Sequence, residues 1–520
     1  MVLDGEPQTT ALATGGASVV RGGIWTTAGQ VLPQLYTIVG SIVAARVLGA
    51  AGVGRISFIA FVEATLVLVL SGGLSRSLMR FVGDSLGRGA GASLRPVGVW
   101  AFRVEVVAGI AGGIALATVG VLGGRPSAAW QLAGVACAAM TAQSAAGSIL
   151  LGAQRWRAAT LVGLVTGTIG IAAKIVVLVE GGGVTGVFAV DAVSSVATLA
   201  VSAELARRAL RDLGPATGSS DELRRAVRRF AWVATVGVVV TFVVWRRTEI
   251  LFLERFATDR QVALYSIPFS AISALLLLPM SAGIALAPAF ANLHGAGDIT
   301  RVRSGFGRSM RLLAVLTLAL TALSFVLGPA LLRLVYGNEF ADSGRLLQIM
   351  LLSLPLVGMM YAATGMLLGL GRQWVPITID AVAGVANLGL DGFLIPRHAA
   401  VGAAIANTIA QVLGSLPVLI YADRILGGIE WRATRLVRGA AASATGAAAA
   451  YAVLALLPDA VGVPLGLLAG TIVLAVAAFA FRVLADDDVT WLAGTCASLL
   501  PSTFSARLVR RPIWSRGGGG

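Results

Sequence analysis

The sequence predicts an all-α, polytopic membrane protein with about fourteen transmembrane helices. Of its 520 residues, 57% are hydrophobic and only 12% are charged. Apolar stretches of about 18 residues or more recur along the whole chain, and each is long enough to cross the hydrocarbon core of a bilayer as a helix. The 65 glycines favour close packing of such helices in lipid.

The predicted spans can be placed in order along the chain. Residues 1–20 have no basic residue and none of the features of a signal peptide, so we expect a disordered cytoplasmic N-terminus. Residues 485–520 are expected to form a cytoplasmic tail. The apolar stretches lie at 22–48, 55–82, 97–122, 128–153, 158–180, 184–206, 230–255, 262–290, 312–335, 344–371, 374–396, 399–422, 439–457 and 463–484.

A basic connection divides these spans. Residues 207–229 contain Gly214-Pro215 and Gly218-Ser219-Ser220, which are typical of a flexible linker. We therefore expect an N-lobe at 21–206 with spans 1–6, a C-lobe at 230–422 with spans 7–12, and spans 13–14 at 423–484. Two short matches between the halves, 46–53 with 255–262 and 186–191 with 402–407, indicate a parallel repeat with a site between its halves.

The basic residues predict the orientation in the cytoplasmic membrane. With the N-terminus inside, 27 of the 40 Lys and Arg residues fall in inside segments, 8 in outside segments and 5 within spans. Cytoplasmic loops carry this kind of excess, so both termini are expected in the cytoplasm. The net charge of +15 is thereby assigned to topology, and no nucleic acid is expected as a partner.

Metal and disulfide chemistry find little support. The two cysteines, Cys137 and Cys496, lie far apart in the chain, and the two histidines, His294 and His398, lie in loops. No Cys/His cluster indicates a zinc site, and no cofactor is expected. No Gly-x-x-x-x-Gly-Lys-Ser/Thr motif indicates a nucleotide site, so we expect any transport to be driven by an ion gradient, with H⁺ or Na⁺ as the coupling ion, by the membrane potential or by consumption of the substrate.

Charges inside an apolar stretch indicate a candidate site. Arg246, Arg247 and Glu249 lie within predicted span 230–255. A charge at this depth costs at least ~2.5 kcal/mol, and such residues usually face a bundle interior or a water-filled cavity.

Several degenerate motifs occur in a fixed order over about residues 20–425. They are Arg46-Val-Leu-Gly-Ala-Ala-Gly-Val-Gly-Arg55, Gly72-Gly-Leu-Ser-Arg-Ser-Leu-Met-Arg-Phe81, Arg246-Arg-Thr-Glu249, Val262-Ala-Leu-Tyr265, Leu334-Val-Tyr-Gly-Asn-Glu-Phe340 and Val401-Gly-Ala-Ala-Ile-Ala-Asn407. In order and spacing they resemble bacterial oligosaccharide flippases, the polysaccharide biosynthesis proteins of the multidrug/oligosaccharidyl-lipid/polysaccharide exporter superfamily. The chain departs from the usual pattern with Glu249 in place of Asp and Ala51 in place of Pro.

The resemblance implies both a fold and a function. Two six-helix lobes would form a V around a central cavity, with two further helices. By alternating access, the protein would move a polyprenyl-diphosphate-linked oligosaccharide from the inner to the outer leaflet. Membrane lipids, and a polymerase and glycosyltransferases of the same pathway, would be its partners. A multidrug antiporter of the same superfamily and a membrane-embedded glycosyltransferase are the alternatives, although the short outer loops disfavour an enzyme.

Arginines and glutamines are the candidate substrate-binding residues. Arg246 and Arg247 would bind the diphosphate, or else would only lock the lobes together. Arg76 and Arg103 would receive it at the inner leaflet, since guanidinium groups pair with phosphate oxygens, or else would snorkel to headgroups or pair with Glu105. The list is completed by Gln30 and Gln34, which share a helix face and would hydrogen-bond sugar hydroxyls or link helices.

Carboxylates within the spans are the candidates for ion coupling. Lys174 and Asp191 lie at matched depth on either side of the Gly181-Gly-Gly183 turn, about 12–13 Å along their helices, so an ion pair is expected. That pair is either structural or part of a proton or cation site. Glu249, Asp380 and Asp391 complete the ion-coupling candidates, and Glu63 is a further lone carboxylate.

Overall fold

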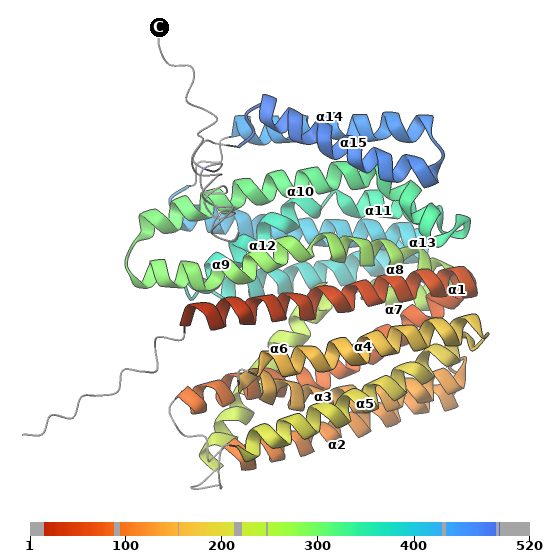
Figure 1. The fold of residues 1–520 in the computed structure, drawn as a ribbon, viewed down its shortest axis with the longest axis vertical. Coiled ribbons are helices and arrows are strands. Elements are labelled where there is room, and N and C mark those ends of the chain that lie inside the picture. The colour runs from red at the N-terminus through yellow and green to blue at the C-terminus, as the bar shows by residue number, and fades with distance from the viewer. Residues whose placement is uncertain are drawn as a thin grey trace, which may run out of the picture. The chain divides into compact units, whose positions relative to one another are not determined.

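A computed structural model describes residues 15–87, 94–153, 155–212, 221–245, 248–428, 433–484 and 488. Over these residues the chain is a succession of helices without strands (Figure 1). The helices are α1 (Gly15–Gly87), α2 (Leu94–Val121), α3 (Ser127–Gly152), α4 (Trp156–Val179), α5 (Gly183–Arg211), α6 (Asp221–Trp245), α7 (Glu249–Phe256), α8 (Asp259–Leu275), α9 (Leu277–Gly295), α10 (Ile299–Tyr336), η2 (Asn338–Phe340), α11 (Ser343–Leu351), α12 (Leu354–Gly369), α13 (Trp374–Ile425), α14 (Ala433–Leu456) and α15 (Asp459–Ala480).

The predicted all-α, polytopic architecture is confirmed, whereas the count of fourteen spans stays a prediction. Ten helices of the described part are long and apolar enough to cross a membrane, or up to eleven if the bent pair α11 and α12 forms one span. Two of the ten, α1 and α13, each consist of two helices joined at a kink. The backbone is non-helical at Gly49 in α1 and at Ala399 in α13. At 1.5 Å per residue, either helix would otherwise exceed twice the thickness of a hydrocarbon core.

Two predicted elements differ from the structure. Predicted span 230–255 contains a turn at Thr248, from which α7 begins, and α6 is described up to Trp245. The linker predicted at 207–229 is helical at both ends, up to Arg211 and again from Asp221, while residues 213–220 lie outside the described part. Glu204 pairs with Arg207 and Arg208 one turn away, and such pairs extend a helix.

The break in α1 is held from a distant part of the chain. Gly49 has φ 68°, a left-handed conformation that glycine adopts without strain. The helix resumes at Ala50, whose backbone N–H donates to Glu339 Oε2 at 2.9 Å. Five residues later Arg55 forms ion pairs with Glu254 at 2.8 Å and with Asp259 at 2.9 Å. The restarted helix is therefore capped and fixed by residues about 200 to 290 positions later.

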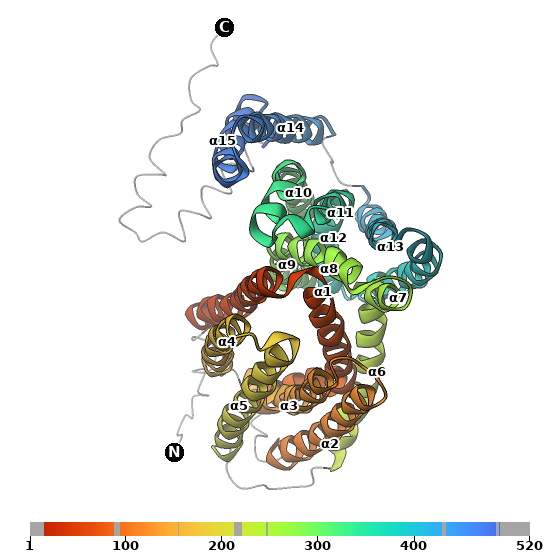
Figure 2. The same ribbon diagram turned by 90° about the vertical axis from the view of Figure 1, so that its right-hand side faces the viewer.

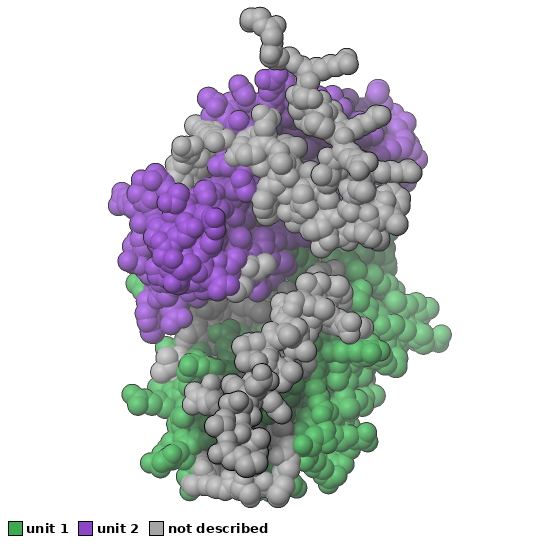
Figure 3. Space-filling view, turned by 60° about the vertical axis from the view of Figure 1, so that its left-hand side comes forward, with its two compact units in different colours: residues 1–277, 335–350, 377–410 green, residues 278–334, 351–376, 411–520 purple. Residues whose placement is uncertain are grey.

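The chain forms two compact units (Figure 3). Unit 1 comprises residues 1–277, 335–350 and 377–410, and unit 2 comprises 278–334, 351–376 and 411–520. Unit 1 thus takes residues from both predicted lobes. The lobes at 21–206 and 230–422 and a cavity between them stay predictions.

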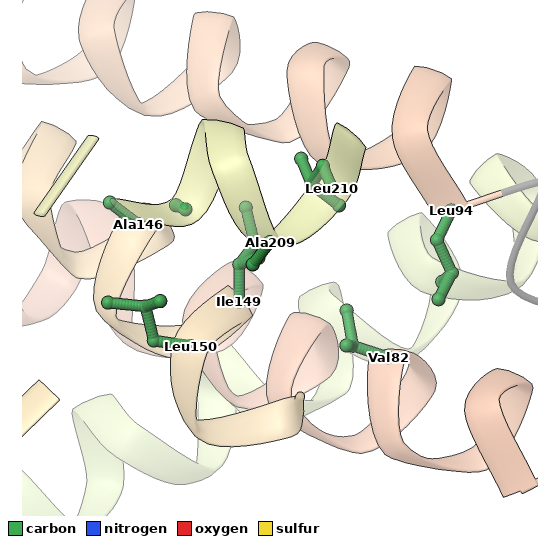
Figure 4. Close-up of a cluster of buried hydrophobic side chains, with 8 residues drawn as sticks. Val82, Leu94, Ala146, Ile149, Leu150, Ala209 and Leu210 are labelled. Carbon is green, nitrogen blue, oxygen red and sulfur yellow. The ribbon is translucent and has the colours of Figure 1, made fainter. Parts of the chain in front are cut away.

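Small residues allow close helix packing in unit 1, where α2, α3 and α5 lie side by side (Figure 2). Gly113 on α2 and Gly134 on α3 face each other so closely that a Cβ on either would lie within 2.6 Å of the other's carbonyl oxygen. A buried apolar cluster lies near one end of these helices (Figure 4), consisting of Val82, Leu94, Ala146, Ile149, Leu150, Ala206, Ala209 and Leu210. Close backbone approach and apolar packing together hold this bundle.

Unit 2 also contains helices that approach each other closely at glycines. A Cβ at Gly365 on α12 would lie 2.3 Å from the carbonyl oxygen of Gly283 on α9. The antiparallel pair α14 and α15 (Figure 1) meets at Gly446 and Gly470. Outside the spans, Asp488 is 1% exposed and accepts hydrogen bonds from Arg308 and Arg311.

We predict that Gly113→Ala destabilises the protein by about 1–3 kcal/mol, since the added methyl group forces α2 and α3 apart. The measurement is the thermal midpoint of the protein in detergent. The control is Gly163→Ala on α4, where a Cβ meets nothing within 4 Å, so the better helix propensity of alanine should leave stability equal or slightly raised. Equal midpoints for the two variants would contradict the packing argument.

Candidate functional site

A cluster of buried polar side chains lies within unit 1. Thr248 and Glu249 come from the start of α7, and Asn387, Asp391 and Asn407 come from α13. Glu249 is 1% exposed and Asp391 is fully buried. The cluster includes two of the predicted ion-coupling residues.

The break in α13 brings its residues together. Asn387 and Asp391 are four residues apart and so lie on the same helix face. Beyond the break at Ala399, the chain reverses, because Gly402 packs against the carbonyl group of Leu394, where a Cβ would lie 2.4 Å away. The second leg thereby brings Asn407 to the same carboxylate that the first leg reaches with Asn387.

The amide of Asn387 bridges the two carboxylates. Its Nδ2 lies 3.3 Å from Glu249 Oε1 and 3.2 Å from Asp391 Oδ2. Asn407 Nδ2 donates to the same Oε1 at 3.0 Å. An amide nitrogen has two hydrogens to donate, so Asn387 can serve both acids at once.

Some oxygens of the cluster accept no hydrogen bond from the described residues. Glu249 Oε2, Asp391 Oδ1 and Asn387 Oδ1 are buried and receive no hydrogen bond from the described residues. No ion pair within this part of the chain includes either carboxylate, and Arg246 and Arg247 lie outside it. Two buried carboxylates close together are disfavoured as two full charges, so the arrangement favours binding of a proton or a small cation.

The oxygen ligands define the kind of cation. Carboxylate, amide and hydroxyl oxygens suit hard cations rather than transition metals. Within the described ranges, no group of three or more His, Cys, Asp or Glu side chains is arranged to hold a metal ion. The side chains of the cluster therefore offer oxygen ligands only, from two carboxylates, two amides and a hydroxyl.

Lys174 and Asp191 form an ion pair elsewhere in unit 1. Lys174 Nζ on α4 lies 2.6 Å from Asp191 Oδ1 on α5, and both side chains keep about 30% of their exposure. Glu63, buried on α1, interacts electrostatically with both. This second charged site is less enclosed than the Glu249 cluster.

The other predicted residues are scattered. Asp380 precedes Asp391 by eleven residues, about 16 Å along α13, and so lies outside the cluster. Gln34 is half-buried on α1, and the side chain of Gln30 lies outside the description. Arg76 is exposed on the same helix.

Arg103 lines a cavity rather than pairing with Glu105. The two residues lie on opposite sides of α2, since Arg103 is exposed whereas Glu105 is fully buried and accepts a hydrogen bond from Ser75 at 2.9 Å. The cavity also involves Arg95 and Arg224.

Sequence reasoning missed the uncharged members of the cluster. Asn387, Asn407 and Thr248 carry no charge to mark them within apolar stretches. The available signals were the four-residue spacing of Asn387 from Asp391 and the position of Asn407 at the end of the repeated motif 402–407.

Two family models match the chain. The model described as polysaccharide biosynthesis protein matches residues 19–294, more than half of the chain, and the model described as MatE matches residues 234–391. The comparison with curated proteins gave no significant match.

Solved structures with a similar fold include three transporters. An inward-facing multidrug resistance MATE transporter of the MOP superfamily is 16% identical over 79% of this chain and 99% of its own, with a TM-score of 0.63. The lipid II flippase MurJ, in an inward closed conformation, is 11% identical over 89% of this chain and 99% of its own, with a TM-score of 0.68. A MOP superfamily transporter from Pyrococcus furiosus is 16% identical over 79% of this chain and 96% of its own, with a TM-score of 0.53.

At these identities the structural likeness shows the fold, and the family follows from the sequence model. The chain belongs to the polysaccharide biosynthesis protein family and has the fold of the MOP superfamily transporters.

Proposed function

We propose that the protein is a flippase of the cytoplasmic membrane, with both termini in the cytoplasm. It moves a polyprenyl-diphosphate-linked oligosaccharide from the inner to the outer leaflet by alternating access. The observation that carries this proposal is the match to the polysaccharide biosynthesis family over residues 19–294. The fold supports it, since a lipid II flippase has the same fold. Its relatives are transporters, so we assign no enzymatic reaction.

We further propose that transport is coupled to H⁺ or Na⁺ at the Glu249–Asp391 pair. An ion bound there offsets the repulsion of two buried carboxylates, and without it they cannot keep the same arrangement. The pair joins α7 to both legs of α13. Occupancy of the site would therefore bias the positions of these helices, which is what coupling requires.

The proposed contacts of the diphosphate are chosen for their positive charge. Arg246 and Arg247 immediately precede Thr248 of the cluster, and they remain the proposed contacts of the diphosphate, because an anion in a low-dielectric cavity needs nearby cations. Export of a cationic drug is the second candidate, supported by the MatE match at 234–391. The excess of arginine disfavours it.

We expect Glu249→Gln and Asp391→Asn to reduce ion-driven flipping at least tenfold while the protein still accumulates in the membrane. Each variant removes one of the two negative charges of the pair. The repulsion that a bound ion would offset is then lost. The measurement is outer-leaflet appearance of a lipid-linked oligosaccharide in vesicles with an imposed pH or Na⁺ gradient. Glu180→Gln, at an exposed position after α4, is the control.

Two results would refute these proposals separately. Wild-type, gradient-dependent rates in both variants would rule out coupling at this pair. Gradient-driven export of a cationic dye by a wild-type protein that leaves the lipid-linked oligosaccharide in place would make it a drug antiporter.

Lys174 and Asp191 allow a distinct test of a structural role. Lys174→Met or Asp191→Leu alone leaves one charge unpaired, so each should lower the yield of folded protein, and the double variant should restore most of it. The effect is expected to be moderate, because the pair is about 30% exposed. Yield is measured by size-exclusion chromatography, and flipping by the double variant is measured beside it. A double variant that folds normally but has lost flipping would place this pair in the transport mechanism.

A further inference from the structure

Two adjoining cavities lie between the first turns of α2 and α6, within unit 1. One, of about 390 Å³, is lined by Arg95, Pro96, Val99, Trp100, Arg103 and Arg224. The other, of about 380 Å³, is lined by Trp100, Asp221, Arg224, Arg225 and Arg228. Trp100 and Arg224 border both, so the two form one arginine-lined cavity.

The charge of this cavity is strongly positive. Among the described residues that line it, five are arginines and Asp221 is the one acidic residue. The carboxylate of Asp221 lies 3.4 Å from Arg224, which is long for an ion pair between exposed side chains. The lining is left with an excess of about four positive charges, which a small anion with several oxygens would neutralise.

Arg224 supplies a second, independent sign of a missing acceptor. Its Nε is buried and donates to no acceptor among the described residues. A buried donor without a partner is unfavourable. A phosphate oxygen in the cavity would satisfy it.

The surface next to the cavity is apolar. Val99, Val107, Ile110 and Ile114 are each at least 40% exposed, and their spacing puts them with Arg103 on one face of α2. Trp100, which lines the cavity, also packs against a buried apolar cluster that includes Val97, Ala101 and Val227. A ligand that fits this surface has an anionic head and a hydrocarbon chain.

We propose that the arginine-lined cavity binds the phosphate headgroup of a membrane lipid, whose chain lies along Val99, Val107, Ile110 and Ile114. The charge distribution predicts that this end of α2 and α6 faces the cytoplasm, so the lipid belongs to the inner leaflet, which is rich in anionic lipid. Guanidinium groups suit phosphate because they donate in a planar fork. The ligand is either an anionic phospholipid or a polyprenyl diphosphate, which share this chemistry. The inference does not depend on the proposed transport.

The test measures lipid binding to the purified full chain by native mass spectrometry. The probes are phosphatidylglycerol, a polyprenyl diphosphate, and inorganic pyrophosphate, which has no chain. The variant Arg95→Gln/Arg103→Gln/Arg224→Gln should bind both lipids at least tenfold more weakly. The control Arg301→Gln/Arg303→Gln/Arg424→Gln removes three exposed arginines of unit 2 and should change binding less than twofold.

Each outcome decides one point. Loss for both lipids indicates a general phosphate-lipid site, and loss for polyprenyl diphosphate alone indicates a docking site for the substrate. Equal losses in the cavity variant and the control, or no loss in either, would overturn the proposal. Pyrophosphate binding as tight as that of the lipids would overturn the role of the α2 stripe. Arg224→Gln alone, expected to weaken binding several-fold, serves if the triple variant does not fold. Because no transport is measured, failure here leaves the flippase proposal standing.

Discussion

The cost of burying two carboxylates side by side is the constraint on which the candidate site depends. Glu249 and Asp391 are almost completely buried, and one amide, that of Asn387, bridges them. A neutral amide satisfies single oxygens but cannot cancel a charge, which is the reason for proposing that the pair binds a proton or a cation. Under that proposal the local structure depends on ion concentration, whereas a well-satisfied apolar core does not.

Charged side chains and small residues stabilise this fold in different ways. Glycine pairs such as Gly113 with Gly134 let backbones approach, and they hold helices whose surroundings give no hydrophobic incentive to associate. The charged contacts instead join segments far apart in sequence, as Arg55 does with Glu254 and Asp259. Glycine contacts tolerate little change at either partner, whereas a polar cluster can exchange its ions and protons.

The sequence was sufficient for the class of fold and for the charged part of the site. Apolar stretches and arginine spacing predicted a polytopic helical protein, and Glu249 and Asp391 stood out because charge is rare there. The turn at Thr248 was not predicted, because Val243 to Phe256 reads as a continuous helical pattern. Asn387 and Asn407 were missed, since an amide in a membrane helix resembles an ordinary interhelical contact and only the reversal at Ala399 brings the two together. The arginine-lined cavity required the packing of α2 against α6, which joins Arg103 to residues more than one hundred positions away.

The restart of α1 after Gly49 has a consequence for biosynthesis. Its cap, Glu339, lies 289 residues downstream, and chains grow at about 5–20 residues per second. The beginning of the protein is therefore in the membrane for about 15–60 s before its own helix terminus can be completed. During that interval Ala50 must find water or a lipid headgroup for its N–H, so the first hairpin can reach its final form only after the middle of the chain has been synthesised.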